Sequence, residues 1–259
     1  QVRLSSSKSI TCGSCNSLID LGHGIGQELL LAEQSHTVRP ILPLGSQGTL
    51  QGTAWQVVGF QQRRGQEPGD DEHFGWSEYL LYHPQRGFAF LVDAEDGWSL
   101  VRPTTGAPQL SANGTSARYL GTSYPQQSSY NAETTYVLGE FYWQVQRGQT
   151  TFNRDFASAR GLLSMEQSPQ EITWSSGDKI ASAAVAKAFG LSDQQALLQR
   201  GDAGPFVAAK GLGCGTLIIL ALLLVLLLVV MNSCSGNSGG GYRSSGGAMG
   251  GYTSGGGHK

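Results

Sequence analysis

The chain of 259 residues has a formal net charge of −2, and only 14% of its residues are charged. This balance excludes a strongly basic nucleic-acid-binding protein, because neither a basic excess nor a run of like charges is present to neutralise phosphates. Four cysteines are too few for a disulfide-rich scaffold, and no motif of a serine hydrolase, a zinc protease or a P-loop nucleotidase occurs. We therefore expect one substantial domain or two small ones, without an obvious catalytic signature.

A Cys-x-x-Cys motif, Cys12 and Cys15, stands near the start of the chain. Two thiolates separated by small residues are typical of one knuckle of a zinc ribbon, which takes a second pair about 15 to 20 residues away. Because the sequence holds no such pair, we expect zinc only if the missing cysteines lie upstream of Gln1. A redox-active or incidental dithiol is the alternative. Residues 1–34 are assigned to this partial zinc-ribbon-like segment.

From Gly48 the apolar residues recur with period two, which predicts β-strands. An antiparallel meander is expected, with strands at 53–60, 78–82, 88–92 and 98–101. Residues 61–75 are predicted as a long polar loop. Its Asp70-Asp71-Glu72-His73 run offers hard ligands for a divalent metal, but a solvated turn is the favoured interpretation because adjacent turn residues rarely all face one ion.

A second β-rich block follows a polar linker at residues 104–116. Its strands are expected at 117–120, 134–145, 149–156, 162–165 and 171–174. Gly139 is predicted at a bulge or bend of the longest strand, and the pattern around it echoes the strand at 53–60. The fold class is therefore mainly β within the α+β class: an antiparallel β-rich domain over residues 48–190, formed by two related β blocks and ending in short helices.

Candidate functional residues come from the aromatic segments of both blocks. An interaction surface is the leading interpretation, made of exposed aromatic residues and nearby carboxylates: Trp76, Glu78, Trp98, Glu140 and Trp143. Glu140 is also considered as a general acid or base, since aromatic neighbours would raise its pKa, but no second catalytic group accompanies it. No catalytic residue is assigned. The alternative is an enzyme with a cleft between the two β blocks that uses Glu140 or the Asp70–His73 loop.

Residues 212–231 contain no charge, proline or side-chain amide. A helix of this length is about 30 Å long and matches the hydrocarbon core of a bilayer, so we predict a transmembrane helix. Residues 191–211 are expected to form a short helix and linker, and the Gly/Ser-rich tail at 232–259 is expected to be disordered. More basic residues lie close to the N-terminal end of the span than close to its C-terminal end, which predicts a cytoplasmic N-terminal domain.

Several motifs together resemble one family. They are the single Cys-x-x-Cys and the segments GTLQGTAWQVVGF, WSEYLLY, GWSL, VLGEFYWQVQRG and EITWSSGD. These segments, spread over residues 1–189, resemble the bacterial domain-of-unknown-function 4178 family. The resemblance implies a full zinc ribbon at the N-terminus, no established activity, and genes that neighbour polyamine synthase-like enzymes and small membrane proteins. We therefore expect a single-pass protein of a bacterial inner membrane, a scaffold or accessory that contacts the lipid bilayer and a protein partner but no nucleic acid.

Overall fold

The computed structural model of the protein describes residues 4–12, 17–21, 29–30 and 38–202. The chain forms two compact units, 1–209 and 210–259, and all described residues belong to the first. The predicted span at 212–231 and the tail at 232–259 lie outside them. Among the residues that are described, no helix is long and apolar enough to cross a membrane.

Most of the described residues lie in β-strands. The N-terminal strands are β1 (Ser9–Thr11), β2 (Leu18–Asp20) and β3 (Leu29–Leu30). The first block holds β4 (Gln47–Leu50), β5 (Thr53–Gln66), β6 (His73–His83), β7 (Gly87–Ala94) and β8 (Gly97–Pro103). The second block holds β9 (Gln109–Leu110), β10 (Ser116–Tyr119), β11 (Thr122–Phe141), β12 (Thr150–Ser158), β13 (Gly161–Gln167) and β14 (Ile172–Ile180). The short helices α1 (Ser182–Ala188), η1 (Ser192–Gln194) and α2 (Gln195–Leu198) follow.

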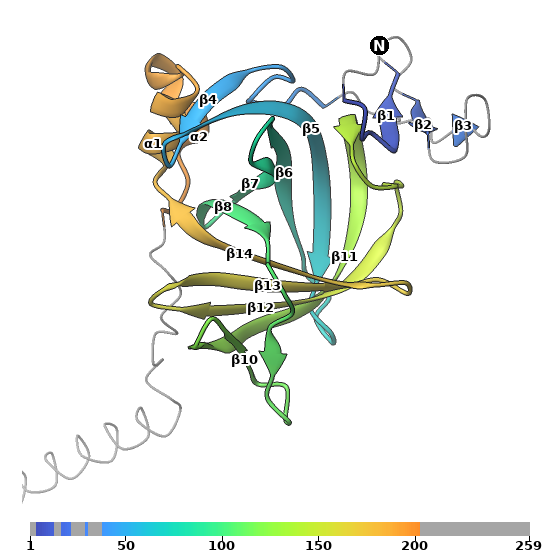
Figure 1. Cartoon of the computed structure of the whole chain (residues 1–259), viewed down its shortest axis with the longest axis vertical. Coiled ribbons are helices and arrows are strands. Elements are labelled where there is room, and N and C mark those ends of the chain that lie inside the picture. Colours follow the sequence, from blue (N-terminus) through green and yellow to red (C-terminus); the bar gives the residue numbers. More distant parts are fainter. Residues whose placement is uncertain (1–3, 13–16, 22–28, 31–37, 203–259) are drawn as a thin grey trace, which may run out of the picture. The chain divides into compact units, whose positions relative to one another are not determined.

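The two β blocks close into one barrel (Figure 1). Strands β5 to β8 form one antiparallel meander and β11 to β14 form another. Strand β5 also pairs with β11, and β8 pairs with β14, so eight strands within the described region make a closed antiparallel ring. Closure leaves these strands without a free edge. The prediction of a mainly antiparallel β fold is confirmed, and hydrogen-bonded ladders join the two blocks where the alternative enzyme hypothesis places a cleft.

Glycines allow the two blocks to approach at the β5–β11 ladder, where Gly59 is paired with Gly139. A Cβ atom on Gly59 would lie 2.9 Å from the carbonyl oxygen of Glu140, and one on Gly139 would overlap the carbonyl oxygen of Val58. Gly139 also has a positive φ of 99°. Only glycine adopts this backbone conformation at little cost. The irregularity of this ladder lies between Thr134 and Tyr136, so the bulge or bend expected at Gly139 stays a prediction.

The strands β5 and β6 are longer than predicted. Residues 61–66 pair with 73–78, so the long polar loop expected at 61–75 is wrong and the connection is only the turn between these strands. Strand β11 likewise begins at Thr122, twelve residues before the predicted strand. Both extensions are rich in polar side chains, so the alternation of apolar residues does not predict them.

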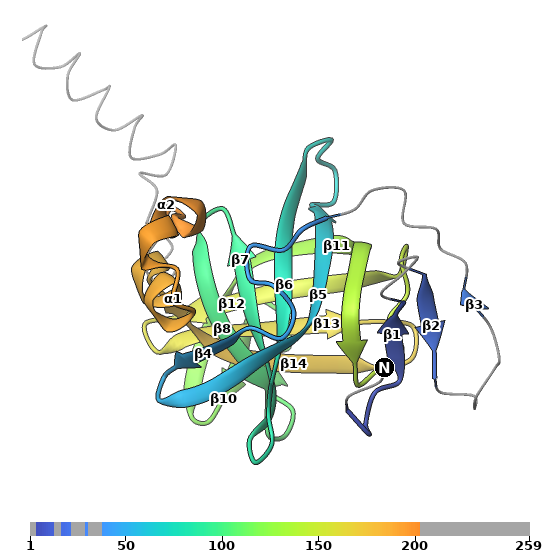
Figure 2. The same cartoon turned by 90° about the horizontal axis from the view of Figure 1, so that it is seen from above.

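The short helices pack on the first block (Figure 2). Val185, Ala186 and Leu198 from α1 and α2 join a core with Trp55, Trp98 and other apolar side chains of β5 to β8. Strand β14 ends at Ile180, and helix α1 begins two residues later at Ser182. Gly190, with a φ of 68°, follows the end of the helix. One face of the first block is therefore covered by helices.

Candidate functional site

The contacts of Arg63 identify the face of the strands that lines the inside of the barrel. From β5, its Nη2 atom donates to Oγ1 of Thr151 on β12 at 2.6 Å, and Nη1 lies 3.1 Å from Oε2 of Glu166 on β13. Around the wall, β13 is three strands from β5, or about 14 Å at 4.8 Å per strand. A guanidinium cannot span that distance along the wall, so these contacts cross the interior. The Arg63 side chain is only 4% exposed.

Polar and aromatic side chains surround Arg63 inside the barrel, and we call them the inner cluster. Its members are Arg63, Trp76, Glu78, Tyr130, Asp155 and Glu166. Trp76 Nε1 donates to Oε1 of Glu78 at 2.6 Å, and Gln61 Nε2 donates to its Oε2 at 2.6 Å. Tyr130 Oη donates to Oδ2 of Asp155 at 2.8 Å. The structure thus brings together two of the predicted site residues, Trp76 and Glu78, with four that were not predicted.

The inner cluster holds three carboxyl groups and one guanidinium. Burial raises the pKa of Asp155, and the nearby Glu78 raises it further, against hydrogen bonds from Ser164 and Tyr130 that lower it. Burial also raises the pKa of Glu166, although Arg63 opposes this. Burial would lower the pKa of Arg63, but attraction to Glu166 and Glu78 outweighs it and the pKa is raised. The carboxyl groups therefore compete for one guanidinium within this cluster.

Aromatic rings stand beside the carboxyl groups. Phe74 stacks on Trp76 with ring centroids 5.7 Å apart, and both rings make T-shaped contacts with Tyr130. Gly65 on β5 makes room for Phe74, because a Cβ atom there would overlap the Phe74 ring. Phe74 nevertheless remains 42% exposed. An aromatic surface next to excess carboxylate attracts positively charged groups.

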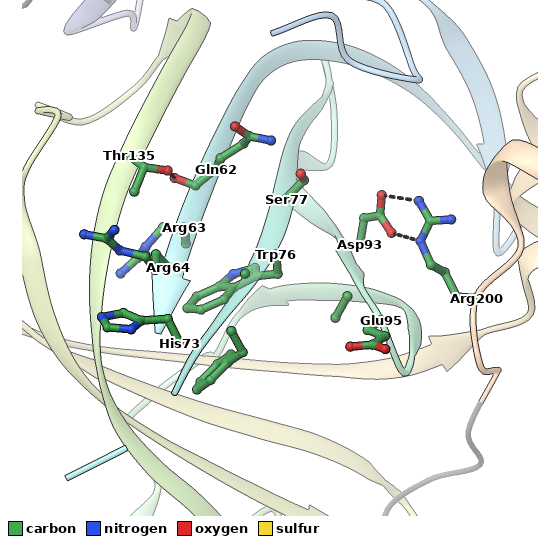
Figure 3. A pocket seen from close by; sticks show the side chains of 13 residues that line it. Gln62, Arg63, Arg64, His73, Trp76, Ser77, Asp93, Glu95, Thr135 and Arg200 are labelled. Carbon is green, nitrogen blue, oxygen red and sulfur yellow. Dashed lines mark hydrogen bonds and ion pairs between the residues drawn. The ribbon is translucent and has the colours of Figure 1, made fainter. Parts of the chain in front are cut away.

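A shallow groove of about 490 Å³ is lined by Arg63, Phe74 and Trp76 together with residues of the outer face of the barrel (Figure 3). Side chains alternate along a strand, so Gln62 and Arg64 point to the outer face while Arg63 points inward. Asp93 accepts hydrogen bonds from Nε and Nη2 of Arg200 at 2.6 and 2.9 Å at one side of the groove. Arg64 pairs with Glu133 at 2.7 Å. These charges are already matched, so the inner cluster is the stronger candidate for recognition.

Two predicted interaction residues, Trp98 and Trp143, pack against the core of the protein. Trp98 is 0% exposed, and its Nε1 donates to the carbonyl oxygen of Leu198 at 2.8 Å. The expectation of an exposed Trp98 is wrong because α2 covers it. Trp143 is half-buried and packs against the rings of Phe90 and Phe141. Neither residue lies in the inner cluster.

The loop residues considered as metal ligands lie at the surface. Asp70 and Glu72 are exposed in the turn between β5 and β6, where Oδ1 of Asp70 accepts the backbone N–H of Glu72 at 3.0 Å. Cys12 follows β1, and its backbone N–H donates to Ser17 across the hairpin, while Cys15 lies outside the described residues. Within the described part of the chain, no group of three or more potential metal ligands occurs.

Glu140 fastens the N-terminal segment to the barrel. Its Oε2 accepts the backbone N–H of Leu4 at 3.0 Å and the hydroxyl of Ser7 at 2.9 Å, and β1 pairs with β11 at this point. This carboxylate therefore serves the fold in the described structure.

Glu140→Ala should free the N-terminal segment while the barrel stays folded. Losing two hydrogen bonds to a charged acceptor costs about 2 kcal/mol of local stability, so backbone amides of residues 4–12 should exchange about 30-fold faster. Hydrogen exchange with mass spectrometry measures this. Glu140→Gln, which keeps an acceptor oxygen, should restore much of the protection; equal exchange in all three proteins would contradict the assignment.

The sequence does not single out four residues of the inner cluster, because they lie on strands with polar inward faces. These residues are Arg63, Tyr130, Asp155 and Glu166. The available signal was the alternation at residues 151–155, where Thr151, Asn153 and Asp155 alternate with Phe152 and Arg154. A strand that alternates with its polar residues directed inward fits a barrel interior as well as it fits a solvated face. The pattern alone does not distinguish the two.

Residues 43–182, more than half of the chain, match the family described as a domain of unknown function (DUF4178). The matched region spans the strands from β4 to β14, which include all eight strands of the barrel. The resemblance drawn from the sequence motifs is confirmed for this region, whereas the predicted zinc-ribbon-like segment at 1–34 and the predicted span at 212–231 lie outside the match. Comparisons with curated proteins and with solved structures return no match to the chain.

Proposed function

The chain belongs to the DUF4178 family, which is defined without an activity. We propose from the geometry that it is a binding module, and from the sequence that this module is held at a membrane. The inner cluster and Phe74 receive a positively charged side chain of a partner protein. One observation carries this proposal: the exposed ring of Phe74 packs with Trp76 and the buried Tyr130 beside carboxyl groups that outnumber the guanidinium of Arg63.

The chemistry favours a lysine or arginine side chain. Aromatic faces attract organic cations, and Arg63 itself already lies 5.7 Å from the ring centroid of Trp76. A second cation would relieve the repulsion between Glu78 and the carboxyl groups of Asp155 and Glu166. A catalytic role finds less support, because Glu140 holds the N-terminal segment and the residues from Asp70 to Glu72 are exposed in a turn.

The membrane part of the proposal rests on the sequence. A helix at 212–231 would hold the barrel close to a bacterial inner membrane on the cytoplasmic side, where a scaffold or accessory protein meets membrane partners. Zinc at Cys12 and Cys15 stays a prediction for a longer chain that supplies the second cysteine pair.

The proposal is tested by titrating the full chain in phosphatidylcholine nanodiscs and following tryptophan fluorescence. The probes are a lysine-rich octapeptide, its glutamate counterpart and n-butylammonium. We expect saturable binding of the lysine peptide only, weakened about tenfold by Glu78→Gln, since such a loss corresponds to about 1.4 kcal/mol. Glu133→Gln is the matched control, because Glu133 pairs with Arg64 on the outer face, and it should leave the affinity unchanged.

Three results would overturn the proposal. The first is equal binding of the glutamate and lysine peptides. The second is a loss of affinity in Glu133→Gln as large as that in Glu78→Gln. The third is binding of n-butylammonium as tightly as the peptide, which would indicate a free amine as the ligand and not a partner protein.

A further inference from the structure

Leu120 is the most exposed large apolar side chain of the described residues, at 82%. It lies in the two-residue turn Leu120-Gly121 between β10 and β11, where Tyr119 pairs with Thr122. An apolar side chain in this position gains nothing from the folded barrel. A single exposed apolar side chain is common at a protein surface, but Leu120 also has a backbone conformation that is unfavourable for leucine.

The turn has a backbone conformation that does not suit leucine. Leu120 has a φ of 46° and Gly121 a φ of 78°. Two consecutive positive φ values are typical of a type I′ hairpin turn, in which asparagine followed by glycine is preferred. The backbone of a leucine is strained in this conformation. A strained backbone together with an exposed apolar side chain indicates that Leu120 serves binding and not folding stability.

Basic side chains flank Leu120. Arg118 and Arg160 are exposed, and Nη1 of Arg160 lies 3.4 Å from the hydroxyl of Thr122, which brings the β12–β13 turn beside the β10–β11 turn. Asp178 lies near Gly161 of that neighbouring turn, so the group retains a net charge of +1. We call Leu120, Arg118 and Arg160 the apolar tip.

We infer that the apolar tip inserts Leu120 into the interface of an anionic bilayer, with Arg118 and Arg160 facing lipid phosphates. This inference rests on the membrane anchoring in the proposed function. Residues 203–211 connect the last described residue to the predicted span and reach at most about 30 Å when extended, so the barrel would stay next to the membrane. One leucine and two arginines bind lipid weakly by themselves, but tethering keeps the local lipid concentration high.

The test uses the full chain in vesicles with about 30% phosphatidylglycerol and in vesicles of phosphatidylcholine alone. Hydrogen exchange of the amides at residues 118–124 is compared between the two lipids. In the unaltered protein we expect exchange about fivefold slower in the anionic vesicles. Leu120→Asn should abolish this ratio while its unfolding temperature stays the same or rises, because Asn-Gly suits the turn. Ile172→Asn, at a side chain that is 56% exposed at the start of β14, should keep the ratio.

Two outcomes would overturn the inference. If the protein floats with the vesicles but its exchange ratio is unchanged by Leu120→Asn, the tip does not contact lipid, although the anchored binding module still stands. If Leu120→Asn unfolds at a lower temperature, Leu120 serves the fold. Flotation is measured separately: a chain that does not float with either vesicle overturns the membrane part of the proposed function as well.

Discussion

Gly139→Ala should lower the free energy of unfolding by about 3 kcal/mol. A non-glycine residue at a φ of 99° costs about 1 to 2 kcal/mol. The new Cβ atom would also overlap the carbonyl oxygen of Val58 and lie 2.9 Å from Cα of Gly59. Because this is the ladder that joins the two β blocks, the overlap forces β5 and β11 apart. Urea unfolding followed by tryptophan fluorescence measures the loss.

Gly148→Ala is the matched control for this prediction. Gly148 has a φ of 80°, but a Cβ atom there would have nothing within 4 Å. It should therefore show only the backbone cost, about 1 kcal/mol. Equal losses in the two variants would mean that the β5–β11 ladder yields to the extra methyl group, which contradicts the close pairing of Gly59 and Gly139.

Arg63→Met should destabilise the barrel by about 2 to 3 kcal/mol at neutral pH. Removing one member of a buried ion pair leaves the other charge uncompensated, which costs about 3 to 5 kcal/mol when both groups are buried. The Glu166 side chain is 40% exposed, and water therefore reduces the cost. Arg64→Met is the control, because Arg64 pairs with Glu133 on the surface, and it should change stability by less than about 1 kcal/mol.

The effect of Arg63→Met should depend on pH in a defined direction. Burial raises the pKa values of Asp155 and Glu166 in the folded protein, so the folded state binds more protons than the unfolded state above their ordinary pKa values. Their contribution is most favourable at low pH and is lost as pH rises through the folded-state pKa values. Without Arg63 the pKa of Glu166 rises further. The variant should therefore lose less stability near pH 4 than near pH 7, and a pH-independent loss would contradict this account.

The sequence predicts the strands whose apolar residues face a covered outer surface. Trp55 and Val57 on β5, and Leu91 on β7, alternate with more exposed residues because helices and the lead-in to β4 pack on one face of the first block. That alternation is a local property, so it is visible in the sequence. The echo around Gly139 likewise falls where β5 and β11 pair, Gly59 with Gly139.

The inner cluster could not be predicted because its contacts join distant strands. Arg63 meets Glu166 across 103 residues, and nothing near either residue shows that both face one interior. A strand normally buries its apolar face, so polar residues that face the barrel interior are predicted as loop or solvated surface. Trp98 illustrates the reverse: it was expected at the surface, but α2, about 100 residues later, covers it.

The indole N–H resonance of Trp76 gives the most direct test of the central claim, that the inner cluster binds a cationic side chain. The chain has five tryptophans, which can be labelled with ¹⁵N and assigned by substitution in the full chain in nanodiscs. On addition of the lysine-rich octapeptide, the Trp76 signal should shift and saturate while that of the buried Trp98 stays fixed, because Trp76 Nε1 donates to Glu78. An unmoved Trp76 signal at saturating peptide would contradict the account.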